Sequence, residues 1–174
     1  QLKSLQLDCV DLYLIHGPFG FKKDADLWPS NVGSAAYSDI DYVETWKGME
    51  QCVQKGLARS IGVSNFNSEQ ITRILNIATI KPVVNQIEVN PNINQKKLIE
   101  FCRERGIVVT GYCPLGRIDA IDIPGVPKPT ILDEGVLAMQ NKYKKTPAQI
   151  VLRYLISLGI SVIPKTVKKE RLIE

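Results

Sequence analysis

The polar side chains that could do chemistry in this sequence lie at the ends of apolar runs. They are an imidazole, amides, hydroxyls, a carboxylate and an ammonium group, which together offer hydrogen-bond donors, acceptors and charge. The members of this polar set are His16, Ser64 with Asn65, Gln86 with Glu88 and Asn90, Tyr112, and Lys165 with Thr166. Polar residues at the ends of several different strands are typical of an active site at one end of a parallel barrel.

Strands and helices alternate along the chain, and these elements must position the polar set. Apolar runs rich in β-branched residues predict strands, whereas apolar residues at helical spacing predict helices. Asn67 and Thr146 are the expected N-caps, Pro147 suits a first helical turn, and Gly56 suits a helix end. The expected strands cover residues 10–15, 59–63, 83–89, 107–112 and 160–164, and the expected helices cover residues 42–55, 68–77, 95–105, 134–144 and 147–158.

This alternation requires a parallel sheet with right-handed crossovers, either an open doubly wound sheet or a (β/α)₈ barrel. No G-x-G-x-x-G follows a strand and no P-loop is present, which weakens the dinucleotide-binding open sheet. We therefore expect an α/β protein with a parallel (β/α)₈ TIM barrel, incomplete here because only about five of its eight strands are found. Residues 1–5 have the pattern of a helix end, so residues 1–174 are expected to be the C-terminal part of a single barrel domain.

Composition and charge exclude several classes of protein. Of the 174 residues, 44% are hydrophobic and 23% are charged, as in an ordinary globular protein. No apolar run approaches the roughly 18 residues that span a bilayer, and the net charge of +4 is not arranged in basic runs interleaved with aromatic residues. We therefore expect neither a membrane nor nucleic acid as a partner. The cysteines Cys9, Cys52, Cys102 and Cys113 form no C-x-x-C pair, which predicts reduced thiols in a cytosolic protein and no metal site.

Five segments carry a resemblance to a known family. They are, in order, LQLDCVDLYLIHGP, GLARSIGVSNF, PVVNQIEVNP, GYCPLG and IPKTVKKERLIE, and they are spread over almost the whole chain. The sequence resembles the C-terminal portion of the aldo-keto reductases. The resemblance implies a (β/α)₈ barrel that binds NADPH without a Rossmann domain and acts, as a monomer, on small carbonyl compounds. The implied reaction is the reduction of aldehydes or ketones to alcohols.

His16 matches the histidine of that family's catalytic tetrad of Asp, Tyr, Lys and His. The resemblance implies that it orients the substrate carbonyl and stabilises negative charge on the carbonyl oxygen. The alternative is a histidine that only ends a strand, but His16 is the only histidine of the chain and lies between VDLYLI and a Gly-Pro turn. The Asp, Tyr and Lys of the tetrad are expected upstream of Gln1, so the chain by itself is expected to be inactive.

The nicotinamide site is implied by four of the polar residues. Ser64, Asn65 and Gln86 resemble the residues that hold the carboxamide, and Tyr112 resembles the ring that stacks on the nicotinamide. Amide and hydroxyl groups suit a carboxamide because it needs both a donor and an acceptor. The alternative is that these residues only end strands, cap helices or fill a layer of the barrel.

The segment after Tyr112 resembles the one that folds over the cofactor pyrophosphate. Cys113 and Leu115 belong to it. The family usually has Ser where this chain has Cys113, and often Ser again where this chain has Arg117. Backbone N–H contacts to phosphate tolerate both differences, whereas hydroxyl contacts do not.

The C-terminal segment resembles the site for the adenosine 2′-phosphate. A loop that begins a helix can bind an anion, because backbone N–H groups face the ligand. Charge-assisted contacts to a dianionic phosphate favour NADPH over NADH. The alternative is that these basic residues only begin a helix and face the solvent. The matching residues are Lys165, Thr166 and Arg171, with Val167 and Lys168 in backbone contacts and Glu174 near the adenine amine.

Gly17 departs from the family pattern, which commonly has Trp at this position in the substrate pocket. The glycine implies a larger pocket or room for another ring, for which Trp28 and Phe21 of the following loop are the candidates. The substrate preference of the family is therefore not carried over to this chain.

Two other functions remain compatible with these residues. One is a non-catalytic NADP-binding scaffold of the same fold, and an upstream Asp, Tyr and Lys at strand ends would argue against it. The other is a truncated product without function, which predicts low solubility and no dinucleotide binding.

Overall fold

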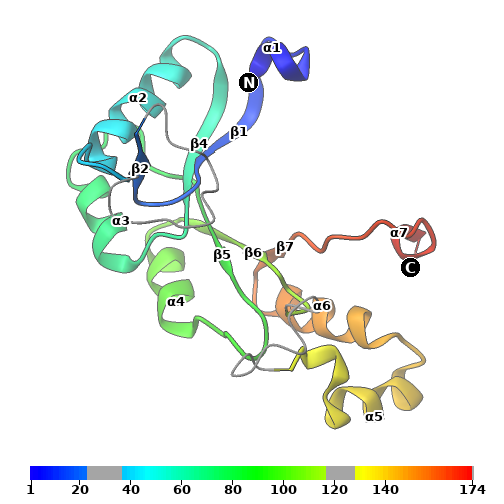
Figure 1. Ribbon diagram of the computed structural model, residues 1–174. Helices are drawn as coiled ribbons and strands as arrows, with labels where there is room; N and C mark the ends of the chain where they lie inside the picture. Colours follow the sequence, from blue (N-terminus) through cyan, green and yellow to red (C-terminus); the bar gives the residue numbers. More distant parts are fainter. Residues whose placement is uncertain (23–36, 117–127, 174) are drawn as a thin grey trace. The chain divides into compact units, whose positions relative to one another are not determined.

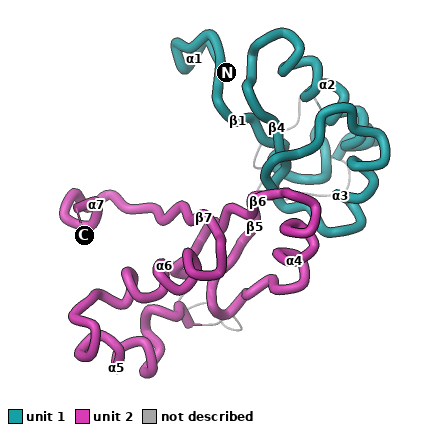
Figure 2. Tube along the Cα trace, turned by 180° about the vertical axis from the view of Figure 1, so that it is seen from behind, with its two compact units in different colours: residues 1–85 teal, residues 86–174 magenta. Residues whose placement is uncertain are grey.

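The computed structural model describes residues 1–22, 37–116 and 128–173. It contains two compact units, Gln1–Asn85 and Gln86–Glu174 (Figure 2). Within the described ranges, no helix is long and apolar enough to cross a membrane. The helices are α1 (Leu2–Leu5), α2 (Tyr42–Gln54), α3 (Ser68–Leu75), α4 (Lys96–Glu104), the 3₁₀ helix η3 (Thr130–Leu132), α5 (Glu134–Tyr143), α6 (Pro147–Ser157) and α7 (Glu170–Ile173) (Figure 1).

Parallel strands alternate with these helices, as predicted. The strand order in the parallel sheet is β1-β4-β5-β6-β7, and the boundary between the two units falls within β5. A separate antiparallel pair consists of β2 (Gly20–Phe21) and β3 (Tyr37–Ser38). The parallel strands are β1 (Val10–Ile15), β4 (Ala58–Ser64), β5 (Val84–Glu88), β6 (Val108–Tyr112) and β7 (Ser161–Val162).

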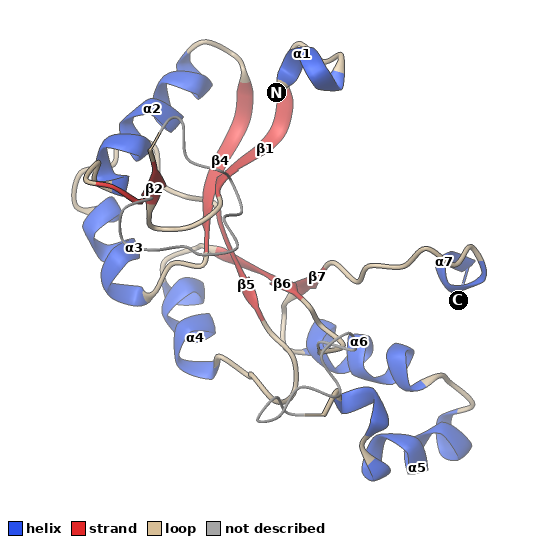
Figure 3. Cartoon of the chain, viewed as in Figure 1, coloured by secondary structure: helices blue, strands red, loops and turns tan. Residues whose placement is uncertain are grey.

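In unit 1, α2 packs against the parallel strands β1 and β4, and α3 packs against α2 (Figure 3). The register of the two strands pairs Val10 with Ala58 and Ile15 with Val63. Burial of large apolar side chains between strands and helices supplies most of the stabilisation of such a unit. The side chains exposed by 1% or less in this unit include Trp46, Ile61, Val63, Phe66, Ile71 and Ile74.

The helix ends have the predicted capping chemistry. The Asn67 side chain accepts from the N–H of Gln70 at 2.8 Å, and the Gln70 side chain accepts from the N–H of Asn67 at 2.9 Å. Thr146 and Gln149 make the equivalent bonds at 3.3 and 2.9 Å at the start of α6. Gly56 follows α2 with a φ of +69°, a conformation that favours glycine. The predicted caps and the predicted helix end are therefore confirmed.

A buried carboxylate ties α2 to the turn that precedes β5. Glu50 is 8% exposed, and its Oε1 accepts from the N–H groups of Thr79 and Ile80 at 2.7 and 2.8 Å. Hydrogen bonds to a charged acceptor offset the cost of removing it from water. Glu50 therefore helps to hold the start of β5, the strand that carries Gln86.

In unit 2, the strands pack closely at Gly111, and α5 and α6 lie side by side (Figure 3). A Cβ atom on Gly111 would lie 3.3 Å from Cβ of Val89 and 3.4 Å from Cγ2 of Ile160. These contacts are tight, so a residue without a side chain suits this position. Val151 and Leu155 of α6 are 2% and 1% exposed and complete the core of this unit.

Two regions differ from the sequence prediction, while the other elements end within two residues of the predicted bounds. The strand expected over residues 160–164 is only Ser161–Val162. In the strand order β7 pairs with β6 alone, and Pro164 has no N–H to donate. No strand was expected between residues 15 and 42, yet this stretch contains β2 and β3, whose two-residue strands are too short to give a periodic pattern.

Candidate active site

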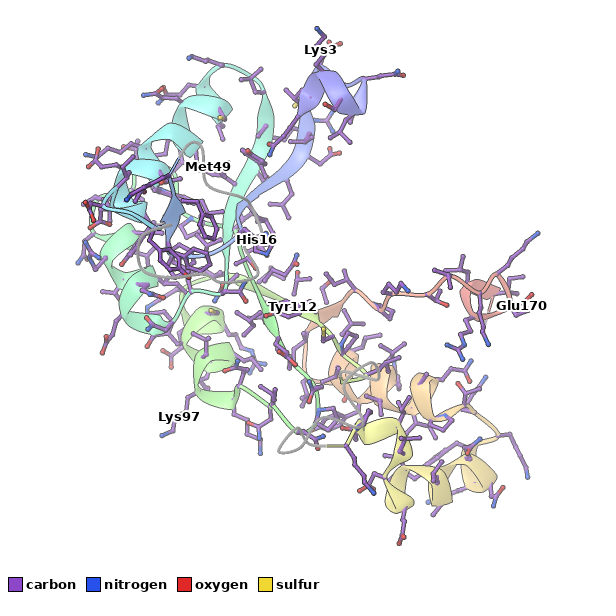
Figure 4. The ribbon with its side chains drawn as sticks, in the orientation of Figure 1. Lys3, His16, Met49, Lys97, Tyr112 and Glu170 are labelled. Atoms are coloured by element: carbon purple, nitrogen blue, oxygen red, sulfur yellow. The ribbon has the colours of Figure 1, made fainter. Side chains whose placement is uncertain are left out.

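His16 lies immediately after β1, at the C-terminal end of the strand (Figure 4). Its side chain is exposed, whereas the next residue, Gly17, is buried. The backbone carbonyl of His16 accepts a hydrogen bond from Nδ2 of Asn65 at 2.8 Å. Because Asn65 follows β4, this bond joins the ends of two paired strands and positions the residue that carries the imidazole.

Asn65 is held in an unusual backbone conformation. Its φ is +63°, in the left-handed region that asparagine tolerates better than most residues. Its Nδ2 also donates to Oγ of Ser64 at 3.2 Å, and Ser64 is 6% exposed. Backbone strain of this kind is concentrated at functional sites. In unit 1, the structure therefore brings His16, Ser64 and Asn65 into one cluster.

Replacement of Asn65 tests this arrangement. We expect Asn65→Ala to lower the free energy of unfolding by about 2 kcal/mol, because alanine loses the amide hydrogen bonds and is disfavoured in the left-handed region. Asn65→Gly loses the same bonds but adopts this backbone readily, so its cost should be smaller by about 1 kcal/mol. Urea unfolding of the three proteins measures the difference, and equal costs would contradict a strained backbone at this position.

In unit 2, Tyr112 lies at the C-terminal end of β6 (Figure 4). Partial burial raises the pKa of its phenol, and interactions with Glu88 and then with Cys113 raise this pKa further. The hydroxyl of Tyr112 therefore remains protonated at neutral pH. Gln86 is half-buried and lies two residues before Glu88 on the same face of β5. Gln86 and Tyr112 thus belong to the same face of the β5–β6 pair.

A tight turn follows Tyr112. The N–H of Gly116 donates to the carbonyl of Cys113 at 2.9 Å, and the φ angles of Cys113 and Gly116 are +47° and +77°. A Cβ atom on Gly116 would lie 3.3 Å from Cα of Pro129. Both the positive φ and the close backbone therefore favour glycine at position 116.

Asn90 belongs to the polar set, but no specific role was predicted for it, and the structure shows that it positions a turn. It is 2% exposed, and its Nδ2 donates to the carbonyl of Cys113 at 3.4 Å. Its Oδ1 accepts from the N–H groups of Asn92 and Ile93, both at 3.1 Å. Asn90 therefore joins the loop after β5 to the turn after β6. The sequence signal that could have indicated this role is the Asn-Pro pair at the end of a buried strand, because such a pair marks a turn.

A cavity of about 540 Å³ in unit 2 is formed by the turn after β6 and the segment after β7. Among the described residues that line it, three are cationic and none is acidic. A concave site of one charge sign favours ligands of the opposite sign. The structure therefore brings together the segments predicted for the pyrophosphate and for the 2′-phosphate. The predicted cofactor residues in this cavity are Cys113, Leu115, Lys165, Thr166, Val167, Lys168 and Arg171.

Thr166 shapes the basic side of this cavity. Its Oγ1 accepts from the N–H of Lys168 at 3.1 Å, which leaves the hydroxyl hydrogen to donate to a ligand. The N–H of Arg171 donates to the carbonyl of Lys168 at 3.2 Å, at the start of α7. Because α7 has only four residues, the side-chain cations rather than a helix dipole supply the positive charge.

Three residues considered from the sequence, Trp28, Arg117 and Glu174, lie outside the described residues. Their roles therefore stay predictions. In the ranges that the structure describes, no group of three His, Cys, Asp or Glu side chains is placed to hold a metal ion.

Among the described residues, the ring beside Gly17 is that of Phe19, which the sequence interpretation did not name. A Cβ atom on Gly17 would lie 2.7 Å from Cε1 of Phe19, so the Phe19 ring occupies that space. Phe21 instead stacks on Tyr37 with ring centroids 5.4 Å apart. The role expected for Phe21 therefore stays a prediction, and the antiparallel pair of β2 and β3 holds its ring against Tyr37.

Residues 1–174 match the family model described as the aldo/keto reductase family. The chain belongs to the aldo/keto reductase family. The match covers the whole chain, and it confirms the resemblance seen in the five sequence segments.

Curated aldo-keto reductases are similar over nearly all of this chain. Aldo-keto reductase family 1 member A1 of Gallus gallus is 45% identical over 175 residues, which cover 99% of this chain and 53% of the relative. Aldo-keto reductase AKR2E4 of Bombyx mori is 48% identical over 171 residues, covering 98% and 52%. The chain therefore spans about half the length of these curated relatives, as expected for a portion of an aldo-keto reductase.

Solved aldo-keto reductases share the fold. The structure of AKR2E4 of Bombyx mori in complex with NADP has a TM-score of 0.86 and 47% identity, and the match covers 98% of this chain and 52% of that one. The aldose reductase of Schistosoma japonicum has a TM-score of 0.86 and 40% identity, with 98% and 53% covered. With the parallel strand order, these matches confirm the predicted fold class, an incomplete (β/α)₈ barrel.

Proposed function

We propose that this chain is the C-terminal part of a single barrel domain that reduces aldehydes and ketones to alcohols with NADPH. The main support is the basic cavity of unit 2, whose described lining includes Lys165, Lys168 and Arg171 and no acidic residue. A volume of about 540 Å³ lies in the range of cofactor sites. The aldo-keto reductase AKR2E4 of Bombyx mori, 47% identical in its solved structure, forms a complex with NADP.

The donors in this cavity fit a 2′-phosphorylated dinucleotide. Lys165 and Arg171 would pair with the 2′-phosphate, and the Thr166 hydroxyl would donate to the same group. Hydrogen bonds between cations and phosphate are roughly twice as strong as neutral ones, which favours NADPH over NADH. Residues 113–116 would lie against the pyrophosphate through backbone N–H groups, a contact that does not need a hydroxyl at Cys113.

The residues at the strand ends fit the reacting end of the cofactor and the substrate. In unit 1, Ser64 and Asn65 would bond the carboxamide; in unit 2, Gln86 would do the same, and Tyr112 would stack on the nicotinamide. Bound NADPH would supply the hydride that reaches the carbonyl carbon. His16 would donate a hydrogen bond to the carbonyl oxygen and stabilise its developing charge. We place the proton-donating Tyr of the tetrad, with its Asp and Lys, outside this chain.

The proposed setting is a cytosolic monomer acting on small-molecule carbonyl compounds. All four cysteines, Cys9, Cys52, Cys102 and Cys113, are free thiols. Free thiols fit a reducing compartment, in which disulfides are rare.

Titration of NADPH into the 174-residue chain, followed by tryptophan fluorescence, tests the proposal. We expect saturable binding without NADPH oxidation in the presence of benzaldehyde, because the proton donor lies elsewhere. The full-length protein that carries this chain should bind NADPH and oxidise it with benzaldehyde. Binding without turnover by the full-length protein would favour the non-catalytic scaffold. Absence of binding by both proteins would contradict the proposed function altogether.

A further inference from the structure

The space beside His16 is taken by the ring of Phe19. Gly17, the residue after His16, is buried. A Cβ atom on Gly17 would lie 2.7 Å from Cε1 and 2.9 Å from Cζ of Phe19. Carbon atoms in van der Waals contact are about 3.5–4.0 Å apart. A side chain at position 17 and the Phe19 ring in its present place therefore exclude each other.

Phe19 is held by two other rings and yet remains exposed. Its ring centroid lies 5.6 Å from that of Phe21 and 5.8 Å from that of Tyr37, at interplanar angles of 78° and 85°. This edge-to-face geometry is the favoured one for aromatic pairs. Because Phe21 and Tyr37 are paired across β2 and β3, the antiparallel pair fixes the Phe19 ring. The ring is nevertheless 53% exposed, so it offers apolar surface to a ligand.

The charges next to this ring argue against an anionic ligand. A cavity of about 310 Å³ is lined in part by Phe19, Asp39, Asp41 and Arg73. Arg73, the one cation among its described lining residues, pairs with Asp41 at 2.5 Å. The exposed Asp39 adds negative charge to the rim. With two aspartates and one arginine, the described charged lining is net negative, which disfavours a carboxylate on a ligand, whereas an uncharged ring would gain apolar contact.

We propose that Phe19 determines substrate specificity. Its ring takes the space that a side chain at position 17 would fill, and it stacks on the ring of an uncharged aromatic aldehyde or ketone. The carbonyl group of that substrate lies at His16. This inference rests on the proposed function. An aryl group covers the exposed ring of Phe19 and removes apolar surface from water. A short aliphatic aldehyde has much less apolar surface to place against the ring, so it gains little from Phe19.

Steady-state kinetics of the full-length protein with benzaldehyde, 4-carboxybenzaldehyde and propanal test the inference. We expect Phe19→Ala to lower kcat/KM about tenfold for benzaldehyde, mainly through KM, and less than about twofold for propanal. The unmodified protein should prefer benzaldehyde to 4-carboxybenzaldehyde. Tyr143→Ala is the matched control, because Tyr143 lies in α5 and its exposure, 54%, is close to the 53% of Phe19. Equal losses for benzaldehyde and propanal, or a preference for the carboxylate, would overturn the inference.

Exchange of the ring between the two positions gives a second test. Gly17→Trp alone should lower the Tm, because the indole meets the Phe19 ring. In Gly17→Trp combined with Phe19→Ala, the Tm should recover, and kcat/KM for benzaldehyde should return to within about threefold of the unmodified protein. If kcat/KM of the double variant fell by the product of the two single losses, and its Tm did not recover, the side chains at positions 17 and 19 would not share one space.

The inference can fail separately from the proposed function. If the unmodified full-length protein oxidises no NADPH with any aldehyde, the proposed function fails, and ligand-observed NMR then measures the affinity of benzyl alcohol for the same protein. Phe19→Ala should weaken this binding by about tenfold if the ring forms the binding surface. Unchanged affinity would overturn the role of Phe19 as well.

Discussion

We expect Lys165→Met to weaken NADPH binding about 30-fold, and the addition of Arg171→Met to weaken it about 100-fold or more. The reason is that each charge-assisted bond to the 2′-phosphate would contribute about 1.5–3 kcal/mol. Methionine keeps most of the length of the lysine side chain but lacks the ammonium group, so both the charge and its hydrogen-bond donors are removed. NADH lacks the 2′-phosphate, so its affinity should change less than about twofold. Fluorescence titration of both cofactors at one ionic strength measures the two constants.

The matched control for these variants is Lys96→Met. Lys96 is exposed at the start of α4 and does not line the basic cavity. The Lys96→Met variant should bind NADPH and NADH with unchanged affinity. The difference between NADPH and NADH should also shrink as salt is added, because the charges involved are exposed and therefore screened. Equal loss of NADH and NADPH binding in Lys165→Met would mean that this lysine supports the segment after β7 rather than the phosphate.

The second large effect is expected at His16. We expect His16→Ala to lower kcat of the full-length protein about 100-fold or more, because it removes a hydrogen-bond donor from the carbonyl oxygen as charge develops there. The dissociation constant for NADPH should change less than about twofold, since the imidazole is assigned to the substrate and not to the cofactor. Stopped-flow measurement of hydride transfer, together with the fluorescence titration, separates the two quantities.

His16→Gln distinguishes catalysis from support of the strand end. Glutamine keeps an N–H donor, so it should recover part of the rate that alanine loses. The bond between Asn65 and the backbone carbonyl of residue 16 does not depend on the side chain and should survive in both variants. A loss confined to KM, or an equal loss of NADPH affinity, would contradict the assigned role.

Local interactions explain why so many elements could be predicted. The capping boxes of Asn67 with Gln70 and of Thr146 with Gln149 each involve residues three apart, so the same few residues encode and form them. Gly56 ends α2 through its own backbone freedom. β7 shows the limit of this logic, because its two residues depend on pairing with β6, which lies far away in the sequence.

The sequence by itself determined the order of the strands and helices, their caps, and which polar residues stand at strand ends, because these depend on neighbouring residues. Only the tertiary structure decided which of these residues meet. Residues 113–116 and 163–171 share one basic cavity although some fifty positions separate them. Asn65 positions His16, and Phe19 rather than Phe21 fills the space at Gly17. Such contacts depend on which strands pair and which rings pack together, and a local sequence pattern does not encode either.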